Sequence, residues 1–279
     1  APLTKGVWGI SNLMNKTILT ITLVILSILL FTIYKDSNKL QLHFLDIGQG
    51  DAILIRTPEG QNILIDGGPD NKLLSEIGKV LPWWEREIDY LVISHYHADH
   101  MMGFIEVLNK YKVRNVLVGA HLPDDFLYRV WVDKLEEKNI ESTIVKAGEQ
   151  FIVSEDLIWQ IILADSYNKD YNENSVVMRL SYKDQDFLFT GDLGAEGEER
   201  ILASGMDISA EYLKVGHHGS RYSSSEAFLQ AVQPKICVIS SGIDNTHGHP
   251  HKEAVERLKD AGCQIKDTQD LGLISFEID

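Results

Sequence analysis

Four side chains of the kinds that bind metals lie within six residues, and they constrain this chain more than any other feature. A strand-like run, Tyr90–Ser94, leads into His95-Tyr96-His97-Ala98-Asp99-His100, and a helical pattern follows. On an extended backbone, side chains two residues apart point the same way, so the first two imidazoles can bind one ion. The aspartate and last histidine fall where the chain turns into the helix and can face a second ion. Imidazole and carboxylate ligands favour zinc or its neighbours over magnesium or calcium.

Two later strand ends carry the same kinds of side chain. FLFTGDL leads a strand into Asp192, and EYLKVGHHGS leads another into His217 and His218, which have glycines on both sides. A lone aspartate at a strand end is more often a turn residue, but the first motif favours a carboxylate that bridges two ions. The predicted metal ligands are therefore His95, His97, Asp99, His100, Asp192, His217 and His218, with Asp99 and Asp192 also predicted to be catalytic.

Three further histidines alternate near the C-terminus, in THGHPH. They can bind metal, donate a proton, or cap the helix expected to begin near Pro250. We predict that His249 takes part in catalysis and that His247 and His251 are peripheral. His43 and His121 are expected to be structural or exposed to solvent.

A run of 18 residues without charge, 17–34, lies between Lys16 and Lys35. A helix of that length covers roughly 27 Å, close to the apolar thickness of a bilayer. We predict a membrane-anchoring helix here, with residues 1–39 as a flank and anchor. A cleaved signal peptide and a buried helix are the alternatives. Lysines at both ends leave the orientation open.

The charge of the chain limits its partners. The formal net charge is −15, and the first 39 residues carry +3, so the rest of the chain carries −18. An acidic body repels polyanions at long range, which argues against a domain that captures nucleic acid by charge alone.

Residues 40–279 alternate between short β-branched runs and helical patterns in two similar halves, with no Pro- or Gly-rich linker. This pattern predicts one α/β domain in which two sheets pack face to face with helices outside. Helices are expected over 72–80, 101–111, 125–137, 195–203, 225–232 and 251–261. The two cysteines, Cys237 and Cys263, are expected to be small buried side chains, with a disulfide between them as the alternative.

The chain resembles the metallo-β-lactamase superfamily. His95, His97, Asp99 and His100 match its H-x-H-x-D-H signature. The runs HFLDIGQGDAILIRTPEGQNILIDGG, NENSVVMRL, LKVGHHGS and GHPHKEAVERL are similar to the C-terminal hydrolase domain of ComEC-type DNA-uptake proteins. The resemblance implies an αββα sandwich with a two-metal site at one edge. It also implies that Asp66 orients the metal-binding loop without binding metal itself.

The chain departs from the wider superfamily in one respect. Many members place a further histidine before the bridging aspartate, where this chain reads LADSYNKDYNENS. Asp165, Asn172 and Asn174 are the polar substitutes available there, and Asn174 is predicted to support the site from behind the ligands. A more weakly held first metal is the expected result.

These observations predict a hydrolase that uses two divalent ions, zinc or alternatively manganese, on a phosphodiester substrate such as DNA. Hydrolysis of a β-lactam, lactone or thioester is the alternative within the same fold. A membrane-anchored binding module without catalysis is the alternative of another class. The resemblance favours a single-pass protein whose catalytic domain is extracytoplasmic.

Overall fold

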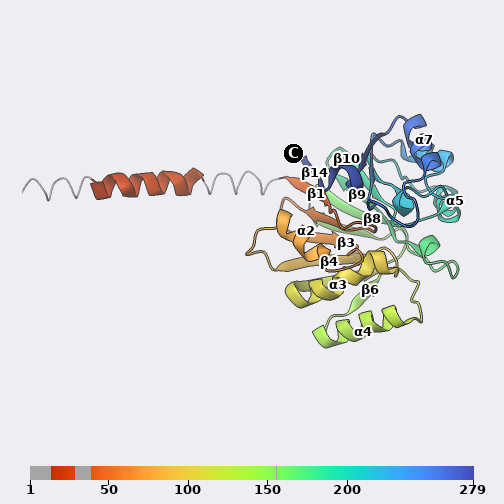
Figure 1. Cartoon of the computed structure of the whole chain (residues 1–279), viewed down its shortest axis with the longest axis horizontal. Coiled ribbons are helices and arrows are strands. Elements are labelled where there is room, and N and C mark those ends of the chain that lie inside the picture. The colour runs from red at the N-terminus through yellow and green to blue at the C-terminus, as the bar shows by residue number, and fades with distance from the viewer. Residues whose placement is uncertain (1–13, 29–38, 155) are drawn as a thin grey trace, which may run out of the picture.

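Two seven-stranded sheets make up the body of the protein (Figure 1), in a computed structural model that describes residues 14–28, 39–154 and 156–279. The first sheet has the order β14 (Ile274–Ile278), β1 (Leu40–Phe44), β2 (Ile53–Arg56), β3 (Asn62–Ile65), β4 (Glu87–Ile93), β5 (Lys112–Val118) and β6 (Ser142–Ile144). The second has the order β13 (Gln264–Asp267), β12 (Ile236–Ile239), β11 (Tyr212–Lys214), β10 (Gln185–Phe189), β9 (Val177–Tyr182), β8 (Leu157–Leu163) and β7 (Gln150–Ser154).

Helices cover the outer face of each sheet. The first sheet packs against α2 (Lys72–Val80), α3 (Ala98–Lys110) and α4 (Phe126–Lys138). The second packs against α5 (Ala195–Ser204), α6 (Glu226–Val232) and α7 (Lys252–Asp260). The described residues also form three short helical turns: η1 (Asn172–Asn174), η2 (Gly216–Gly219) and α8 (Thr268–Leu271). The predicted αββα sandwich is confirmed.

Alternating side chains build the core between the sheets. In β1 the side chains alternate between two faces. Leu40, Leu42 and Phe44 are buried against the second sheet, whereas Gln41 and His43, on the opposite face, are half-buried. In β2 and β3 both faces are buried, because the opposite face meets the helices. Successive side chains on a strand point to opposite faces, so this pattern follows from the sequence.

Strands β5, β6 and β7 were not anticipated from the sequence. Strand β5 begins with charged, exposed residues, β6 is exposed throughout, and β7 has an exposed or half-buried pattern along its length. Strands β6 and β7 have no buried face, and the buried residues of β5, Val113 and Val116–Val118, do not alternate with polar ones, so none of the three shows the apolar alternation that reveals a strand. Helix α3 also begins at Ala98, three residues earlier than expected.

The N-terminal helix covers residues 14–28 among those described, and its apolar side chains are exposed. Among the described residues, no helix has both the length and the apolar character needed to cross a bilayer. The predicted membrane-anchoring segment, 17–34, extends over residues 29–34, which lie outside the described part of the chain. A spanning helix is therefore not confirmed.

A disulfide joins Cys237 and Cys263, with 5.9 Å between their Cα atoms. The favoured expectation of two free, buried thiols is therefore wrong. The sheet order explains the pairing, because β12 and β13 are parallel neighbours and bring residue 237 opposite Ile265, beside residue 263.

Candidate metal centre

The predicted metal ligands meet at one end of the sandwich, where strands of both sheets finish. Asp66 follows β3, and the segment from His95 to His100 leads from β4 into α3. Asp192 follows β10, and the histidine pair lies in η2 directly after β11. Five of the predicted ligands line a cleft of about 640 Å³ with other loop residues: His97, Asp99, Asp192, His217 and His218. Each half of the chain thus contributes side chains to a single site.

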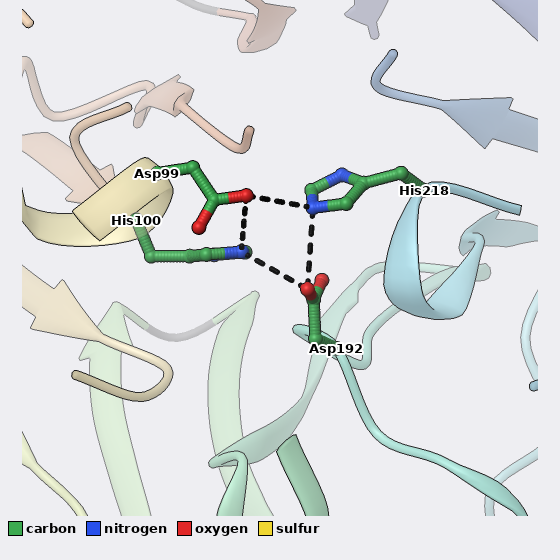
Figure 2. A group of neighbouring side chains, drawn as sticks. All are labelled: Asp99, His100, Asp192 and His218. Carbon is green, nitrogen blue, oxygen red and sulfur yellow. Dashed lines mark ion pairs between the residues drawn. The ribbon is translucent and has the colours of Figure 1, made fainter. Parts of the chain in front are cut away.

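Four side chains form the centre of this site (Figure 2). One carboxylate oxygen of Asp192 lies 3.3 Å from Nε2 of His100 and 3.2 Å from Nε2 of His218. Oδ2 of Asp99 lies 3.9 Å from the first of these nitrogens and 3.4 Å from the second. Ligand atoms this close together, converging from both halves, form a group that can bind a cation.

Asp66 holds His100 and the metal-binding loop in place. Its carboxylate accepts hydrogen bonds from the backbone N–H of Ser94 at 2.7 Å and from the Ser94 hydroxyl at 2.6 Å. It also lies 2.9 Å from Nδ1 of His100, which directs the Nε2 atom of that ring toward the centre. A carboxylate behind a ligating histidine orients the ring and fixes which nitrogen faces the metal.

His95 and His97 form a second pair of imidazoles beside the first group. Nε2 of His95 lies 3.0 Å from Nδ1 of His97. The His95 ring centroid lies 4.1 Å from that of His100, and the His97 ring stacks on Tyr171. The two rings therefore face one region, as expected from residues two apart on an extended backbone.

The histidine pair of η2 has an unusual backbone. His217 and His218 have φ angles of 49° and 53°, in the left-handed region that L-residues rarely adopt. Nδ1 of His218 lies 2.8 Å from the carbonyl of Ser240, so its other nitrogen faces Asp192. Nε2 of His217 lies 3.9 Å from the same carboxylate. Both rings thus face Asp192.

Sequence reasoning missed two residues of the site, Asp51 and Lys214. Both are buried and form an ion pair. Oδ1 of Asp51 lies 3.4 Å from Nδ1 of His218, and Nζ of Lys214 donates to the carbonyl of Gly191 at 2.9 Å. The sequence held one indication of each residue: Asp51 ends the glycine-rich run GQGD, and Lys214 lies in the apolar strand at the start of LKVGHHGS.

His249 lies at the edge of the same cleft and is buried. Its ring centroid is 5.3 Å from that of His217. Asn245 fixes its backbone by accepting from its N–H at 2.9 Å and donating to its carbonyl at 2.6 Å. The ring of His247 stacks on it, whereas Nδ1 of His251 accepts from the backbone N–H of Arg221.

Asn174 lies outside this group. Its side chain accepts from the N–H of Tyr167 and donates to the carbonyls of Asn168 and Asp170, so it shapes the loop before η1. Asn172, the first residue of η1, has its amide nitrogen 3.5 Å from Nε2 of His217. Asp165 pairs with Arg200 instead. Of the three polar substitutes, only Asn172 lines the cleft.

Opposing charges shift the pKa values at the centre. Burial opposes a charge on His100 and on His218, but nearby carboxylates, Asp192 first, outweigh it and raise both pKa values well above the usual range. Burial likewise opposes the charge of Asp192, yet these histidines hold its pKa well below the usual range. The carboxylates therefore favour positive charge here, which a divalent cation supplies.

Unpaired buried atoms show that this donor set fits a metal. Nε2 of His100, Nε2 of His218 and Oδ1 of Asp192 are buried and have no hydrogen-bond partner among residues 39–154 and 156–279. Buried polar atoms without partners are costly, and a shared cation would satisfy all three. Imidazole with carboxylate suits zinc or manganese.

Comparison with known proteins agrees with this fold and site. Residues 45–242 match the family described as the Metallo-beta-lactamase superfamily, so this chain belongs to that superfamily. Among curated relatives, ComE operon protein 3 of Bacillus subtilis is 28% identical over 272 residues, covering 89% of this chain and 34% of that protein. Recombination protein 2 of Haemophilus influenzae is 30% identical, covering 86% of this chain and 30% of that protein. The chain thus spans about a third of the length of these relatives.

Solved structures share the fold at low identity. The diiron β-hydroxylase CmlA of Streptomyces venezuelae superposes with a TM-score of 0.57 at 14% identity, covering 86% of this chain and 54% of that one. A diphosphatase from the PhnP family superposes with a TM-score of 0.50 at 16% identity, covering 86% of this chain and 99% of that one. These similarities support the sandwich architecture.

Proposed function

We propose that this chain is a two-metal phosphodiesterase. The observation that carries the proposal is the position of Asp192, whose carboxylate faces His100 and His218 from within a cleft that also contains His97 and His217. Such a carboxylate suits a bridge between two ions, as in enzymes that hydrolyse phosphate esters. Two divalent ions, zinc or alternatively manganese, would polarise the ester and activate the attacking water.

Each protein group has a separate role in this proposal. His95 and His97 would hold the first ion, while Asp99, His100 and His218 would hold the second. We propose that His217 would be a further ligand of the first ion. It would replace the histidine that many superfamily members place before the bridging aspartate and that this chain lacks. Asp66 orients the ring of His100 through their 2.9 Å contact.

His249 is positioned to contact the substrate at the edge of the cleft. Burial, followed by His218 and His217, lowers the pKa of His249 to about 3, so the ring is neutral near pH 7. A neutral imidazole can donate one hydrogen bond, and we propose that it donates to a phosphate oxygen or the leaving oxygen.

The substrate class rests on the relatives. One curated relative is named a competence protein and another a recombination protein, and a solved structure with the same fold is named a diphosphatase. These names support a phosphate ester of nucleic acid. The net charge of −15 gives no long-range attraction for DNA, so a smaller phosphodiester is the competing substrate.

The test is an assay of the purified full chain with zinc and manganese supplied in turn. The substrates are single-stranded DNA, bis-p-nitrophenyl phosphate and a β-lactam, and Asp192→Ala is the control. Metal-dependent DNA cleavage that the variant lacks supports a nuclease, and cleavage of the small diester alone supports a small-phosphodiester hydrolase. Opening of the β-lactam without phosphoester turnover contradicts the proposal.

We also propose that the apolar N-terminal segment attaches the protein to a lipid bilayer, with the catalytic domain on the extracytoplasmic side. The described part of this segment exposes Leu19, Ile25 and Leu26, among others. Burying such side chains in lipid is favourable by roughly 25 cal/mol per Å².

A further inference from the structure

Two adjacent tryptophans lie exposed on the loop between α2 and β4. Trp83 is 79% exposed and Trp84 is 58% exposed. Their ring centroids are 5.6 Å apart in an edge-to-face arrangement. Tryptophan combines a large apolar ring with one N–H donor, so a pair exposed to this extent is typical of an interaction surface.

The strand register places this loop at the end of the domain where the N-terminal segment enters. Gln41 of β1 pairs with Arg56 of β2, which pairs with Asn62 of β3. The N–H of Asn62 donates to the side chain of Asp89 in β4. The beginnings of β1 and β4 therefore lie at the same edge, three strand spacings or about 14 Å apart. Figure 1 shows the loop after α2 extending from the end of the domain where β1 begins.

The metal centre lies at the other end of the same strands. His95 lies two residues after the end of β4, whereas Trp84 lies three residues before its first residue, Glu87. A seven-residue strand covers about 23 Å, so the tryptophan loop and the cleft face opposite directions.

The length of the connecting chain limits how far this end can be from the apolar segment. The charge-free run ends at Tyr34, and the described domain begins at Lys39. Five residues reach at most about 18 Å when fully extended. If the run lies in a bilayer, the end of the domain with Trp83 and Trp84 is held next to the membrane surface.

We propose that the Trp83–Trp84 loop inserts into the interface of the lipid bilayer and sets the orientation of the domain. Tryptophan is enriched at this depth, where its ring meets the acyl chains and its N–H meets the head groups. The catalytic cleft then faces away from the membrane, open to a substrate in solution. This inference rests on the proposed attachment of the N-terminal segment.

The test uses the full chain reconstituted in phosphatidylcholine vesicles with and without lipid brominated near the head group, which quenches tryptophan on contact. Trp83→Phe/Trp84→Phe keeps the apolar surface but removes the fluorescence of the loop. The difference between wild type and this variant is the signal of the pair, and brominated lipid is expected to remove about half of it or more. The matched control adds Phe126→Trp to the double variant, because Phe126 is 76% exposed and begins α4 at the opposite end.

Each outcome decides the proposal. Quenching of the loop signal without quenching at position 126 supports it. If the protein binds the vesicles but the fluorescence of the loop is not quenched, this inference is overturned, whereas the proposed attachment of the N-terminal segment stands. Equal quenching at both positions overturns it, because the domain then has no fixed orientation. Failure of the full chain to float with vesicles overturns both the attachment and this inference, while the hydrolase assay is unaffected.

Discussion

The carboxylate of Asp51 and the ammonium group of Lys214 form an ion pair inside the protein, directly behind the metal centre. The aspartate lies between β1 and β2 of the first sheet, and the lysine is the last residue of β11 in the second. Burial opposes the charge of Lys214, but Asp51 and then Asp192 outweigh it and raise its pKa. The pair therefore links the two halves, and its carboxylate also faces His218.

Removing one partner of this pair should be costlier than removing both. Lys214→Met leaves the buried carboxylate of Asp51 without its ammonium partner, and we expect a loss of about 3 kcal/mol in the free energy of unfolding, because His218 compensates only part of the charge. The double variant Asp51→Asn/Lys214→Met should recover part of that loss. Urea denaturation of the metal-free chain measures both. Glu87→Gln, which breaks surface ion pairs with Arg114 and Lys112, is the control and should change the stability much less. A double variant less stable than Lys214→Met would contradict this account.

The two adjacent histidines should differ in their effect on metal binding. His218 faces both Asp99 and Asp192, so His218→Ala should abolish tight binding of one ion. His217→Ala should weaken binding by a smaller factor, on the order of 10–100-fold, and leave the second ion in place. Isothermal titration with zinc gives the stoichiometry and affinity of each variant. Identical titrations for the two variants would show that the rings are not assigned to different ions.

His249 should matter for turnover more than for metal content. His249→Ala removes a ring at the edge of the cleft without removing a predicted metal ligand. We expect kcat to fall about 100-fold or more, as for a lost proton or hydrogen-bond donor. Elemental analysis should find the metal content unchanged. His247→Ala, which removes the neighbouring stacked ring, is the control and should retain most of the activity.

The disulfide should contribute substantially to stability. It closes a segment with a sequence separation of 26, for which the loss of unfolded-state entropy is worth about 3 kcal/mol. Cys237→Ala/Cys263→Ala should lower the free energy of unfolding by about that amount. Wild type unfolded with a reductant present should resemble the variant. Equal urea midpoints for the oxidised wild type and the variant would refute this.

His43 should make stability depend on pH. Burial, followed by the charge of Arg56, lowers the pKa of His43 from 6.5 to about 4. Between these values the unfolded chain binds the additional proton, so the free energy of unfolding falls as the pH falls from 6.5 toward 4. His43→Gln should reduce this loss by on the order of 1 kcal/mol, since the ring is only partly buried. Parallel pH profiles for wild type and variant would rule this out.

The sequence predicted the ligand cluster because its chemistry is local. His95, His97 and His100 lie within six residues, and the strand before them is apolar enough to recognise. Asp51 and Lys214 could not be found in this way, because their significance depends on a contact between two sheets. The disulfide was not the favoured prediction for the same reason, since only the parallel pairing of β12 and β13 brings Cys237 beside Cys263.

The central ligands come from both halves of the chain, two before residue 101 and two after residue 191. A divalent ion held by His100 and Asp192 would therefore be a non-covalent cross-link closing a loop of 92 residues. Closing a loop of that size is costly in entropy for the unfolded chain, so each tightly bound ion would also oppose separation of the two sheets. Neither half made alone would contain the site. Removal of the ions by a chelator should therefore weaken the contact between the two sheets before either half unfolds.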